Sequence, residues 1–329
     1  MKYIQLTFAA LFILFAVLFI KNYIPKKSPQ LKTKPKLNVI TSVSPLTNIV
    51  DNIGGDRINL YGLIPEGTDS HTFEPAPSDA ILLSKSDLII LNGLHLETPT
   101  EKLALTNKKP ITEIFKLGEN TISPKDWIFD FTFPRQKGDP NPHLWMNPIY
   151  ARRYAELIRD LLIKHDPANT DYYRSKGEKL IAKIDQLDKS IDQSIKTIPP
   201  QNRKLLTYHD SWAYFARRYG MEVIGAIQPS DFKEPSPQEV GSLIDQLKKE
   251  QIPAIFGSEV FPSKVLTQIA KEADVAWVTT LRDDDLPGEK TARNHTYIGL
   301  MLEDMKNMII PLGGNIAALK DIDPSNIIP

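Results

Sequence analysis

Residues 166–197 read DPANTDYYRSKGEKLIAKIDQLDKSIDQSIKT and lie near the middle of a chain of 329 residues. Apolar side chains recur through this stretch at steps of three and four residues, which is the period of a helix with one buried face. They are Leu180, Ile181, Ile184, Leu187, Ile191 and Ile195. The pattern predicts one long amphipathic helix over 166–198. An ordinary surface helix of one domain would show the same stripe, but the central position favours a helix that joins two halves of the molecule.

The segments on either side of this helix alternate short apolar runs with helical stretches. Such alternation is typical of parallel α/β layers. The strand-like runs are LNVITSV (37–43), INLYGLIP (58–65) and DLIILNGL (87–94) before the helix, and KLLTYHD (204–210), MEVIGAI (221–227) and IPAIFGSE (252–259) after it. We therefore expect an α/β fold of two similar parallel-sheet lobes, at 38–165 and 199–315, joined by the long helix and followed by a tail at 316–329.

The chain begins with a hydrophobic segment. After Lys2, the run YIQLTFAALFILFAVLFI from Tyr3 to Ile20 carries no charge, and its 18 residues would extend about 27 Å as a helix, close to the thickness of a hydrocarbon core. No small-residue cleavage site or lipid-accepting cysteine follows, so residues 1–21 predict an uncleaved signal anchor, with a cleaved signal peptide as the alternative. The lysines and prolines of residues 22–37 predict an extended tether.

Composition excludes several kinds of site. The chain has 40 basic and 40 acidic side chains, and this balance offers no basic footprint for binding nucleic acid. It has no cysteine, which excludes disulfides, thiolate metal ligands and thiol nucleophiles.

Four potential metal ligands occur in turn-like contexts at nearly even intervals. They are His71 in GTDSHTFEP, His143 in DPNPHLWMNP, His209 in TYHDSWAYF and Asp284 in LRDDDLPG. Each follows or adjoins a strand-like run, which is INLYGLI, WIFDFTF, KLLTY and VAWVTTL respectively. Because ligands of open α/β sheets bind in the loops at the carboxyl ends of strands, these four side chains could converge on one divalent cation.

Three neutral imidazoles and one carboxylate form a donor set that suits tetrahedral zinc. A bidentate carboxylate or an added water would accommodate manganese. The usual affinity order places zinc above manganese, so selectivity depends on geometry and availability. The ligand residues therefore do not distinguish Zn²⁺ from Mn²⁺ as the bound cargo.

Longer motifs surround these residues. They are SPLTNIVDNIGGDRINLYGLIPEG (44–67), SHTFEPAPSDAILLSKSDLIILNGLHLE (70–97), NPHLWMNP (141–148), HDSWAYFARRYG (209–220) and TYIGLMLEDMKNMI (296–309). In these motifs the chain resembles the zinc/manganese (cluster A-I, metal-binding) solute-binding proteins of ABC importers, over nearly everything after the N-terminal segment. The resemblance implies that the ligands are His71, His143, His209 and one aspartate of LRDDDLPG. Asp284 matches best because Leu286 follows it by two residues, with Asp283 and Asp285 as alternatives.

The resemblance also implies a role. Proteins of this family are extracytoplasmic receptors, not enzymes; they bind a metal between two lobes bridged by a rigid helix and deliver it to an ABC permease with its ATPase subunit. We expect the same of this chain, as a monomer tethered to the cytoplasmic membrane by residues 3–20. Relatives with glutamate at the third ligand favour manganese or iron, so His209 favours zinc. Many zinc-dedicated members carry a histidine-rich loop, yet residues 116–142 contain no histidine, which argues the other way.

Three acidic residues are candidates for supporting the ligands, because metal-bound histidines usually donate their other ring proton to a carboxylate or carbonyl. Glu74 could do so or could instead brace the helix that follows it. Asp210 is more simply explained as the N-cap of SWAYFARRYG. Glu259 lies at a strand end of the second lobe, where it could act as a fifth donor or as a supporting group.

The remaining histidines, His95, His165 and His295, have no matching role as ligands. Two other classes of protein remain as alternatives. A zinc hydrolase would also use histidine and carboxylate ligands, but it needs an open position for water, and no HExxH motif occurs. A surface adhesin would use the metal only to stabilise its fold.

Overall fold

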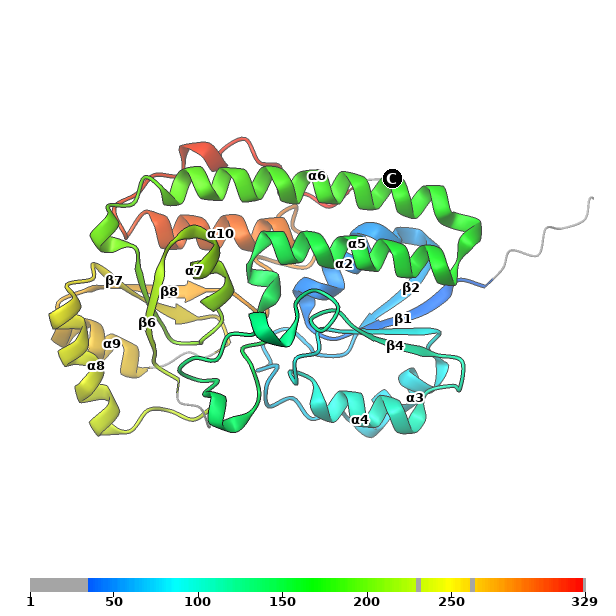
Figure 1. Ribbon diagram of the computed structural model, residues 1–329, viewed down its shortest axis with the longest axis horizontal. Coiled ribbons are helices and arrows are strands. Elements are labelled where there is room, and N and C mark those ends of the chain that lie inside the picture. Colours follow the sequence, from blue (N-terminus) through cyan, green and yellow to red (C-terminus); the bar gives the residue numbers. More distant parts are fainter. Residues whose placement is uncertain (1–34, 229–231, 261–263, 328–329) are drawn as a thin grey trace, which may run out of the picture. The chain divides into compact units, whose positions relative to one another are not determined.

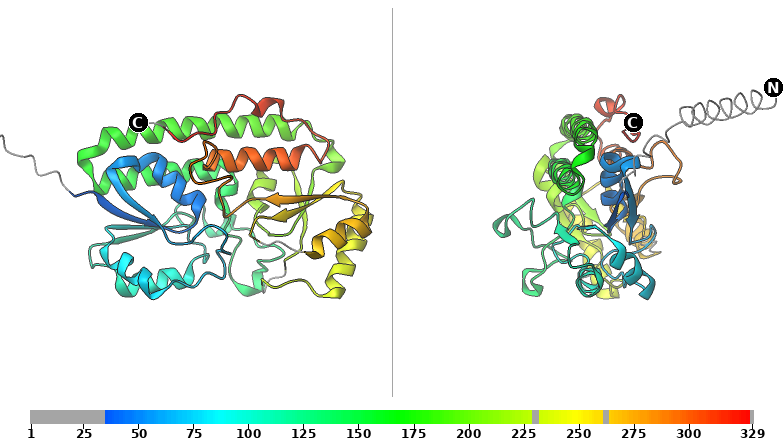
Figure 2. Two further views of the ribbon diagram at one scale, coloured as in Figure 1. Left: turned by 180° about the vertical axis from the view of Figure 1, so that it is seen from behind. Right: turned by 90° about the vertical axis from the view of Figure 1, so that its right-hand side faces the viewer.

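A computed structural model describes residues 35–228, 232–260 and 264–327 (Figures 1 and 2). The hydrophobic segment expected at 1–21, and nearly all of the tether expected at 22–37, lie outside the described residues. Within the described part of the chain, none of the helices combines the length and the apolarity needed to cross a membrane.

The first lobe is built around a parallel sheet with the strand order β2-β1-β3-β4. Its strands are β1 (Leu37–Thr41), β2 (Ile58–Gly62), β3 (Leu88–Leu91) and β4 (Glu113–Lys116). Helices α2 (Ser44–Gly54), α3 (Pro77–Lys85) and α4 (Thr98–Asn107) connect them, with a short 3-10 turn, η1 (Gly55–Arg57), after α2. The strands β2 and β3 lie on opposite sides of β1, so the strand order changes direction there. Open parallel sheets bind ligands at such a switch point.

The second lobe repeats this topology with the order β6-β5-β7-β8, again all parallel. Its strands are β5 (Lys204–Thr207), β6 (Glu222–Ala226), β7 (Ala254–Ser258) and β8 (Ala276–Leu281), connected by α7 (Ala213–Tyr219), α8 (Pro237–Glu250) and α9 (Lys264–Ala273). Helix α8 begins with a capping box in which Ser236 Oγ accepts the N–H of Glu239 at 3.3 Å. Helix α7 ends at Gly220, whose φ of 66° is the left-handed conformation that favours glycine.

A long helix links the lobes. After α5 (Pro148–His165) and the turn η5 (Pro167–Asn169), helix α6 (Thr170–Ile195) packs on α5 and α2 and also on α10 (Tyr297–Ile309), which follows the second sheet. Figure 1 shows α6 running above both sheets. Five residues of the expected stripe are buried, and Ile181 is half-buried. The predicted fold of two parallel α/β lobes joined by a long helix is therefore confirmed.

Most of the connection between β4 and α5 is irregular, with 3-10 turns η2 (Pro124–Asp126), η3 (Arg135–Lys137) and η4 (Leu144–Met146). It contains WIFDFTF (127–133), which we expected to be strand-like; that expectation is wrong. The backbone N–H groups of Ile128 and Thr132 donate instead to Tyr214 Oη at 3.1 Å and Asp210 Oδ2 at 2.9 Å. Side chains of the second lobe thus accept the backbone hydrogen bonds that a neighbouring strand would otherwise accept.

The expected C-terminal tail packs against the body. The turn η7 (Ala317–Leu319) contacts α6. Another short 3-10 turn, η6 (Pro200–Asn202), lies just before β5 at the start of the second lobe. Farther along, Asn326 Oδ1 accepts hydrogen bonds from Asn48 and Asn52 of α2 at 3.0 and 2.8 Å. Residues 316–327 therefore return from the second lobe to the first.

Candidate metal centre

Three imidazoles meet between the lobes. The Nε2 atoms of His71 and His143 are 3.2 Å apart, those of His71 and His209 are 3.3 Å apart, and those of His209 and His143 are 3.0 Å apart. Two ligands of one ion can be at most about 4.2 Å apart, because each metal–nitrogen bond is about 2.1 Å long. Among the described residues, these three form the group of potential donors that lie mutually within 4.8 Å. One divalent cation could therefore contact all three.

Two of the three histidines lie in loops that follow parallel strands. His71 lies in the loop that follows β2, and His209 lies two residues beyond the end of β5. His143 precedes η4, at the end of the irregular connection that leaves β4. The expected strand-end placement is therefore wrong for His143, because the apolar run at 127–133 is not a strand and His143 lies at the far end of the connection, just before η4.

Two amides set the orientation of the buried rings. Asn141 Oδ1 lies 2.9 Å from His143 Nδ1, and Gln228 Oε1 lies 2.7 Å from His209 Nδ1. Each amide oxygen can only accept, so each Nδ1 carries the proton and leaves the Nε2 lone pair facing the centre of the triad. Sequence reasoning looked for carboxylates and missed both amides. Asn141 could have been found from its position two residues before His143 in the quoted motif NPHLWMNP, whereas no local signal marks Gln228.

Burial favours the neutral form of two of the three imidazoles, those of His71 and His143. It lowers the pKa of His71 and of His143 well below the ordinary histidine value, and the neighbouring histidines lower both further. A metal binds the deprotonated ring, so the fold supplies ligands in the required state.

The three adjacent aspartates differ in where they point. Asp283 Oδ2 lies 3.3 Å from His209 Nε2 and 3.9 Å from His143 Nε2. Asp284 accepts the N–H of Ser70 through Oδ2 at 3.3 Å, and its buried Oδ1 has no hydrogen-bond partner. Asp285 is turned away, since both of its carboxylate oxygens accept the N–H of Gly67, at 3.0 and 2.8 Å. The structure thus places the Asp283 carboxylate beside two of the three imidazoles and turns Asp285 away, while among the described residues neither Asp283 nor Asp284 belongs to the donor group within 4.8 Å.

A family model matches most of the chain. Residues 39–309, well over half of the chain, match the family described as "Zinc-uptake complex component A periplasmic". This chain belongs to that family.

Curated relatives cover most of the chain. The metal ABC transporter substrate-binding lipoprotein FimA of Streptococcus parasanguinis is 29% identical over 271 residues, which is 81% of this chain and 86% of the relative. The manganese ABC transporter substrate-binding lipoprotein PsaA of Streptococcus pneumoniae is 27% identical over 285 residues, or 85% and 90% of the two chains.

Solved structures share the fold. A manganese-bound periplasmic metal-binding protein from Candidatus Liberibacter asiaticus superimposes with a TM-score of 0.74 at 27% identity, covering 84% of this chain and all of its own (100%). The periplasmic zinc-binding protein TroA of Treponema pallidum matches with a TM-score of 0.76 at 24% identity, covering 84% of this chain and 99% of its own. At that identity, the second match supports the fold alone.

Glu259, the third supporting candidate, anchors the aspartate loop of this family member. Its Oε1 accepts the N–H groups of Asp283, Asp284 and Asp285 at 2.9, 3.0 and 3.1 Å. One carboxylate oxygen therefore fixes three successive peptide groups. Asp304 on α10 adds to this anchor by accepting the N–H of Arg282 at 2.8 Å.

The other two supporting candidates have different positions. Asp210 does not cap α7, whose N-cap is Trp212, so that expectation is wrong; its carboxylate instead holds Thr132 of the β4–α5 connection. Glu74 is exposed, and no described residue hydrogen-bonds its side chain. The acid that supports the start of α3 is Asp79, whose Oδ2 accepts the N–H of Ala76 at 2.8 Å. Asp79 lies one turn further along, inside the helix, where the capping-box geometry requires it.

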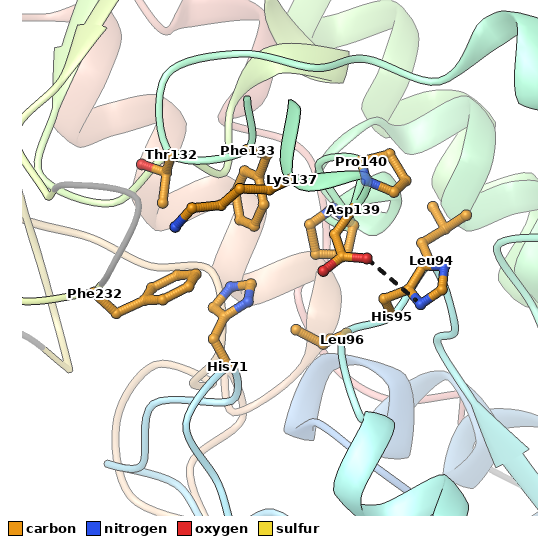
Figure 3. Close-up of a pocket in the computed structure, with 11 residues that line it drawn as sticks. His71, Leu94, His95, Leu96, Thr132, Phe133, Lys137, Asp139, Pro140 and Phe232 are labelled. Carbon is orange, nitrogen blue, oxygen red and sulfur yellow. Dashed lines mark ion pairs between the residues drawn. The ribbon is translucent and has the colours of Figure 1, made fainter. Parts of the chain in front are cut away.

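A cavity of about 220 Å³ opens onto His71 (Figure 3). Phe232 stacks on the His71 ring, with centroids 4.8 Å apart and planes 17° apart, and Phe133 lies tilted at 5.3 Å. His95 also lines the cavity and pairs with Asp139 at 3.6 Å. Both aromatic rings line this cavity beside His71.

The other two histidines have partners away from the triad. His165 Nε2 lies 2.7 Å from Glu113 Oε2, and His295 Nδ1 lies 3.3 Å from the carbonyl of Pro287. Neither joins the donor group described above.

Proposed function

We propose that this protein is the extracytoplasmic substrate-binding component of an ABC importer and that it captures a divalent transition metal, Zn²⁺ or Mn²⁺, as cargo between its lobes. The observation that carries the proposal is the triad of Nε2 atoms separated by 3.0 to 3.3 Å. His71, His143 and His209 supply the nitrogen ligands, and Asp284 supplies a carboxylate oxygen. Glu259 supports the aspartate loop, while Asp210 supports the connection that leads to His143.

Family membership and the hydrophobic N-terminal segment support the remaining parts of the proposal. The protein hands its cargo to a permease that works with an ATPase subunit, and it does so as a monomer held at the outer face of the cytoplasmic membrane by residues 3–20. The division into lobes at 38–165 and 199–315, joined by 166–198, is part of the same proposal. A catalytic role is not proposed, because three imidazoles and a carboxylate leave little room for a reactive water.

Metal analysis of the purified full chain tests the proposal. We expect one equivalent of bound zinc or manganese in the wild type, and less than one-tenth of that in His143→Ala and in His209→Ala after dialysis, because each change removes a buried ligand of the site. His165→Ala, which lies outside the triad, is the matched control and should retain the metal. Full stoichiometry in both site variants would contradict the assignment. Hydrolysis of a test ester in proportion to metal content would instead favour a zinc hydrolase.

A further inference from the structure

We propose that His95 and Asp139 form a second, weaker cation site on the solvent side of the cavity that opens onto His71, and that an incoming divalent metal binds there before it reaches the triad. This inference rests on the proposed function and deepens it, because it assigns a route by which the cargo enters. One imidazole nitrogen and one carboxylate oxygen suit a transition-metal ion that keeps part of its hydration shell.

The two side chains are spaced for a bridging ion. His95 Nδ1 and Asp139 Oδ1 are 3.6 Å apart, which is too long for a hydrogen bond between these atoms. Two ligands that are each about 2.1 Å from one ion lie about 3.4 Å apart at a tetrahedral angle, so the observed gap is close to what a shared cation needs. The side chains are 55% and 60% exposed, which leaves room for water to complete the coordination. Two protein donors and water give a weak site, as a step in transit requires.

The pair lies on the cavity that reaches the triad. His71, His95 and Asp139 all line this cavity of about 220 Å³ (Figure 3). His71 is partly buried, whereas His143 and His209 are buried, so His71 is the imidazole of the triad that a cation in this cavity meets first. Pockets for drug-sized ligands have volumes of roughly 300–1,000 Å³, so this smaller cavity suits an ion with its waters better than an organic chelate.

The charges of the cavity are divided between its two sides. In Figure 3 the Asp139 carboxylate lies beside His95, whereas the Lys137 ammonium points to the side of Thr132 and Phe232. A carboxylate in a narrow hollow raises the local concentration of cations. The cation is therefore attracted to the side of the cavity where the imidazole of His95 is available to bind it.

The backbone fixes His95 in this position. His95 and the preceding Leu94 both have left-handed φ angles, of 68° and 51°, which are uncommon for residues other than glycine. Glu97 and Glu119 hold the loop by accepting backbone N–H groups, that of Gly93 at 3.0 Å and that of Leu94 at 3.1 Å. Leu94 is fully buried, while His95 is exposed at the cavity. Residues held in such conformations cluster at functional sites, and the cavity gives this one a function to serve.

The route lies within the first lobe. His95 is in the loop after β3, Asp139 is in the β4–α5 connection, and His71 is in the loop after β2. His143 follows Asp139 by four residues in the same connection. A cation can therefore pass from the pair to two imidazoles of the triad without leaving the first lobe, and His209 of the second lobe completes its binding.

Stopped-flow kinetics of Zn²⁺ binding to the metal-free full chain tests the route. The variant His95→Asn removes the imidazole without changing the charge, and asparagine tolerates the left-handed φ at this position. Tryptophan fluorescence reports arrival at the triad, because the Trp145 ring lies 5.1 Å from the ring of His143. We expect the association rate constant to fall about tenfold, the low end of what a raised local cation concentration gives. Release into excess chelator should slow by the same factor, since a step that eases entry also eases exit, and the equilibrium affinity should stay unchanged.

Controls separate coordination from charge and from folding. His165→Asn is the matched control, because His165 also lies beside a carboxylate, that of Glu113, but does not line the cavity. Asp139→Asn should slow both rates as His95→Asn does, and at high salt as well, where screening removes long-range attraction. A thermal melt checks that each variant is folded. Faster release with an unchanged association rate would mean that His95 only braces the triad, and unchanged rates in both directions would also overturn the route.

Binding at the pair itself has a separate readout. Titration of excess Zn²⁺ into the zinc-loaded wild type should shift the ring-nitrogen NMR signals of His95 but not those of His165, and Asp139→Asn should abolish the shift. A His95 ring that does not respond would overturn this site and leave the triad and the proposed function intact. Failure of the wild type to retain zinc or manganese would overturn the proposed function, and the response of His95 would still decide whether the pair binds a cation.

Discussion

Trp145 donates its indole Nε1–H to the backbone carbonyl of Asp283 at 2.8 Å, while its ring lies 5.1 Å from the ring of His143. One fully buried side chain therefore contacts a proposed ligand of the first lobe, His143, and binds the loop that carries the three aspartates of the second. This hydrogen bond is one of several that join the two lobes beside the site.

Replacing Trp145 with phenylalanine should separate these two roles. The phenyl ring keeps the apolar contact with His143 but leaves the buried carbonyl of Asp283 without a donor, which costs about 1–3 kcal/mol. We expect urea unfolding to show a loss of that size, and metal affinity to fall about tenfold because the carboxylate loop is less firmly placed. Trp277→Phe, at a site that is 38% exposed, is the control. Equal affinity in wild type and Trp145→Phe would show that the indole only fills space.

Gln228 should matter to the metal although it does not touch it. The change Gln228→Leu removes the acceptor of the His209 Nδ1 proton and frees the ring to rotate or change tautomer. We expect metal affinity to fall by about 10- to 100-fold, as for other supporting groups of metal-bound histidines. Isothermal titration with zinc measures the effect. The exposed Gln201 offers a control in Gln201→Leu, and a wild-type affinity in Gln228→Leu would mean that packing alone orients His209.

The long helix and the histidines could be predicted because their signals are local. The apolar stripe from Leu180 to Ile195 has the period of a helix. A histidine that follows a strand-like run indicates a loop at the carboxyl edge of a sheet. The run at 127–133 misled because its apolar residues lie in an irregular connection, in which Phe133 is buried but Phe131 is 49% exposed. Side chains of the other lobe accept hydrogen bonds from the backbone of this run, and the local sequence pattern does not reveal such distant acceptors.

The supporting groups were harder to predict for a related reason. His209 and Gln228 each lie two residues beyond the end of a strand, β5 and β6 respectively, and the pairing of these strands brings them together. The choice among Asp283, Asp284 and Asp285 depends on backbone torsions that Glu259 imposes from a third segment. A linear sequence specifies such contacts only through the complete fold.

Glu97 should make stability depend on pH without involving the metal. Burial raises the pKa of Glu97 from the ordinary 4.5 to about 7, although its two oxygens accept the N–H groups of Asn92 and Gly93 at 2.8 and 3.0 Å. The folded protein therefore binds a proton that the unfolded chain releases above pH 4.5. The contribution to stability is complete below that value and is lost as the pH rises to about 7, a loss of about 3 kcal/mol for this shift.

The variant Glu97→Gln isolates this effect in metal-free protein. Glutamine cannot accept both N–H groups, so we expect the variant to be less stable than the wild type at pH 4.5. Between pH 4.5 and pH 8 the difference should shift toward the variant by about 3 kcal/mol, because only the wild type must bury a charge as its carboxyl ionises. Chemical denaturation across this range measures the shift, with the exposed Glu178→Gln as a flat control. A constant difference would mean that the two N–H donors keep the carboxylate ionised.

Asn52 should tie the C-terminal segment to the first lobe. Its Oδ1 accepts the N–H of Ile327 at 2.7 Å, and its Nδ2 donates to Asn326 Oδ1 at 2.8 Å and to the carbonyl of Asn48 at 2.9 Å. The side chain is 4% exposed, so Asn52→Ala leaves several polar groups without partners, at a cost of about 3 kcal/mol in the free energy of unfolding.

Urea unfolding measures that cost, and digestion with a carboxypeptidase shows whether the segment is released. Asn59→Ala is the matched control, since the exposed Asn59 makes a single side-chain hydrogen bond of 3.0 Å, to Asn38. We expect faster trimming of the C-terminus in Asn52→Ala than in Asn59→Ala, because the last described residues are bound to α2 chiefly through Asn52 and Asn48. Equal stability and equal trimming in the two variants would show that Lys176 and Lys183, which donate to carbonyls of Ile327 and Ser325, hold the segment without Asn52.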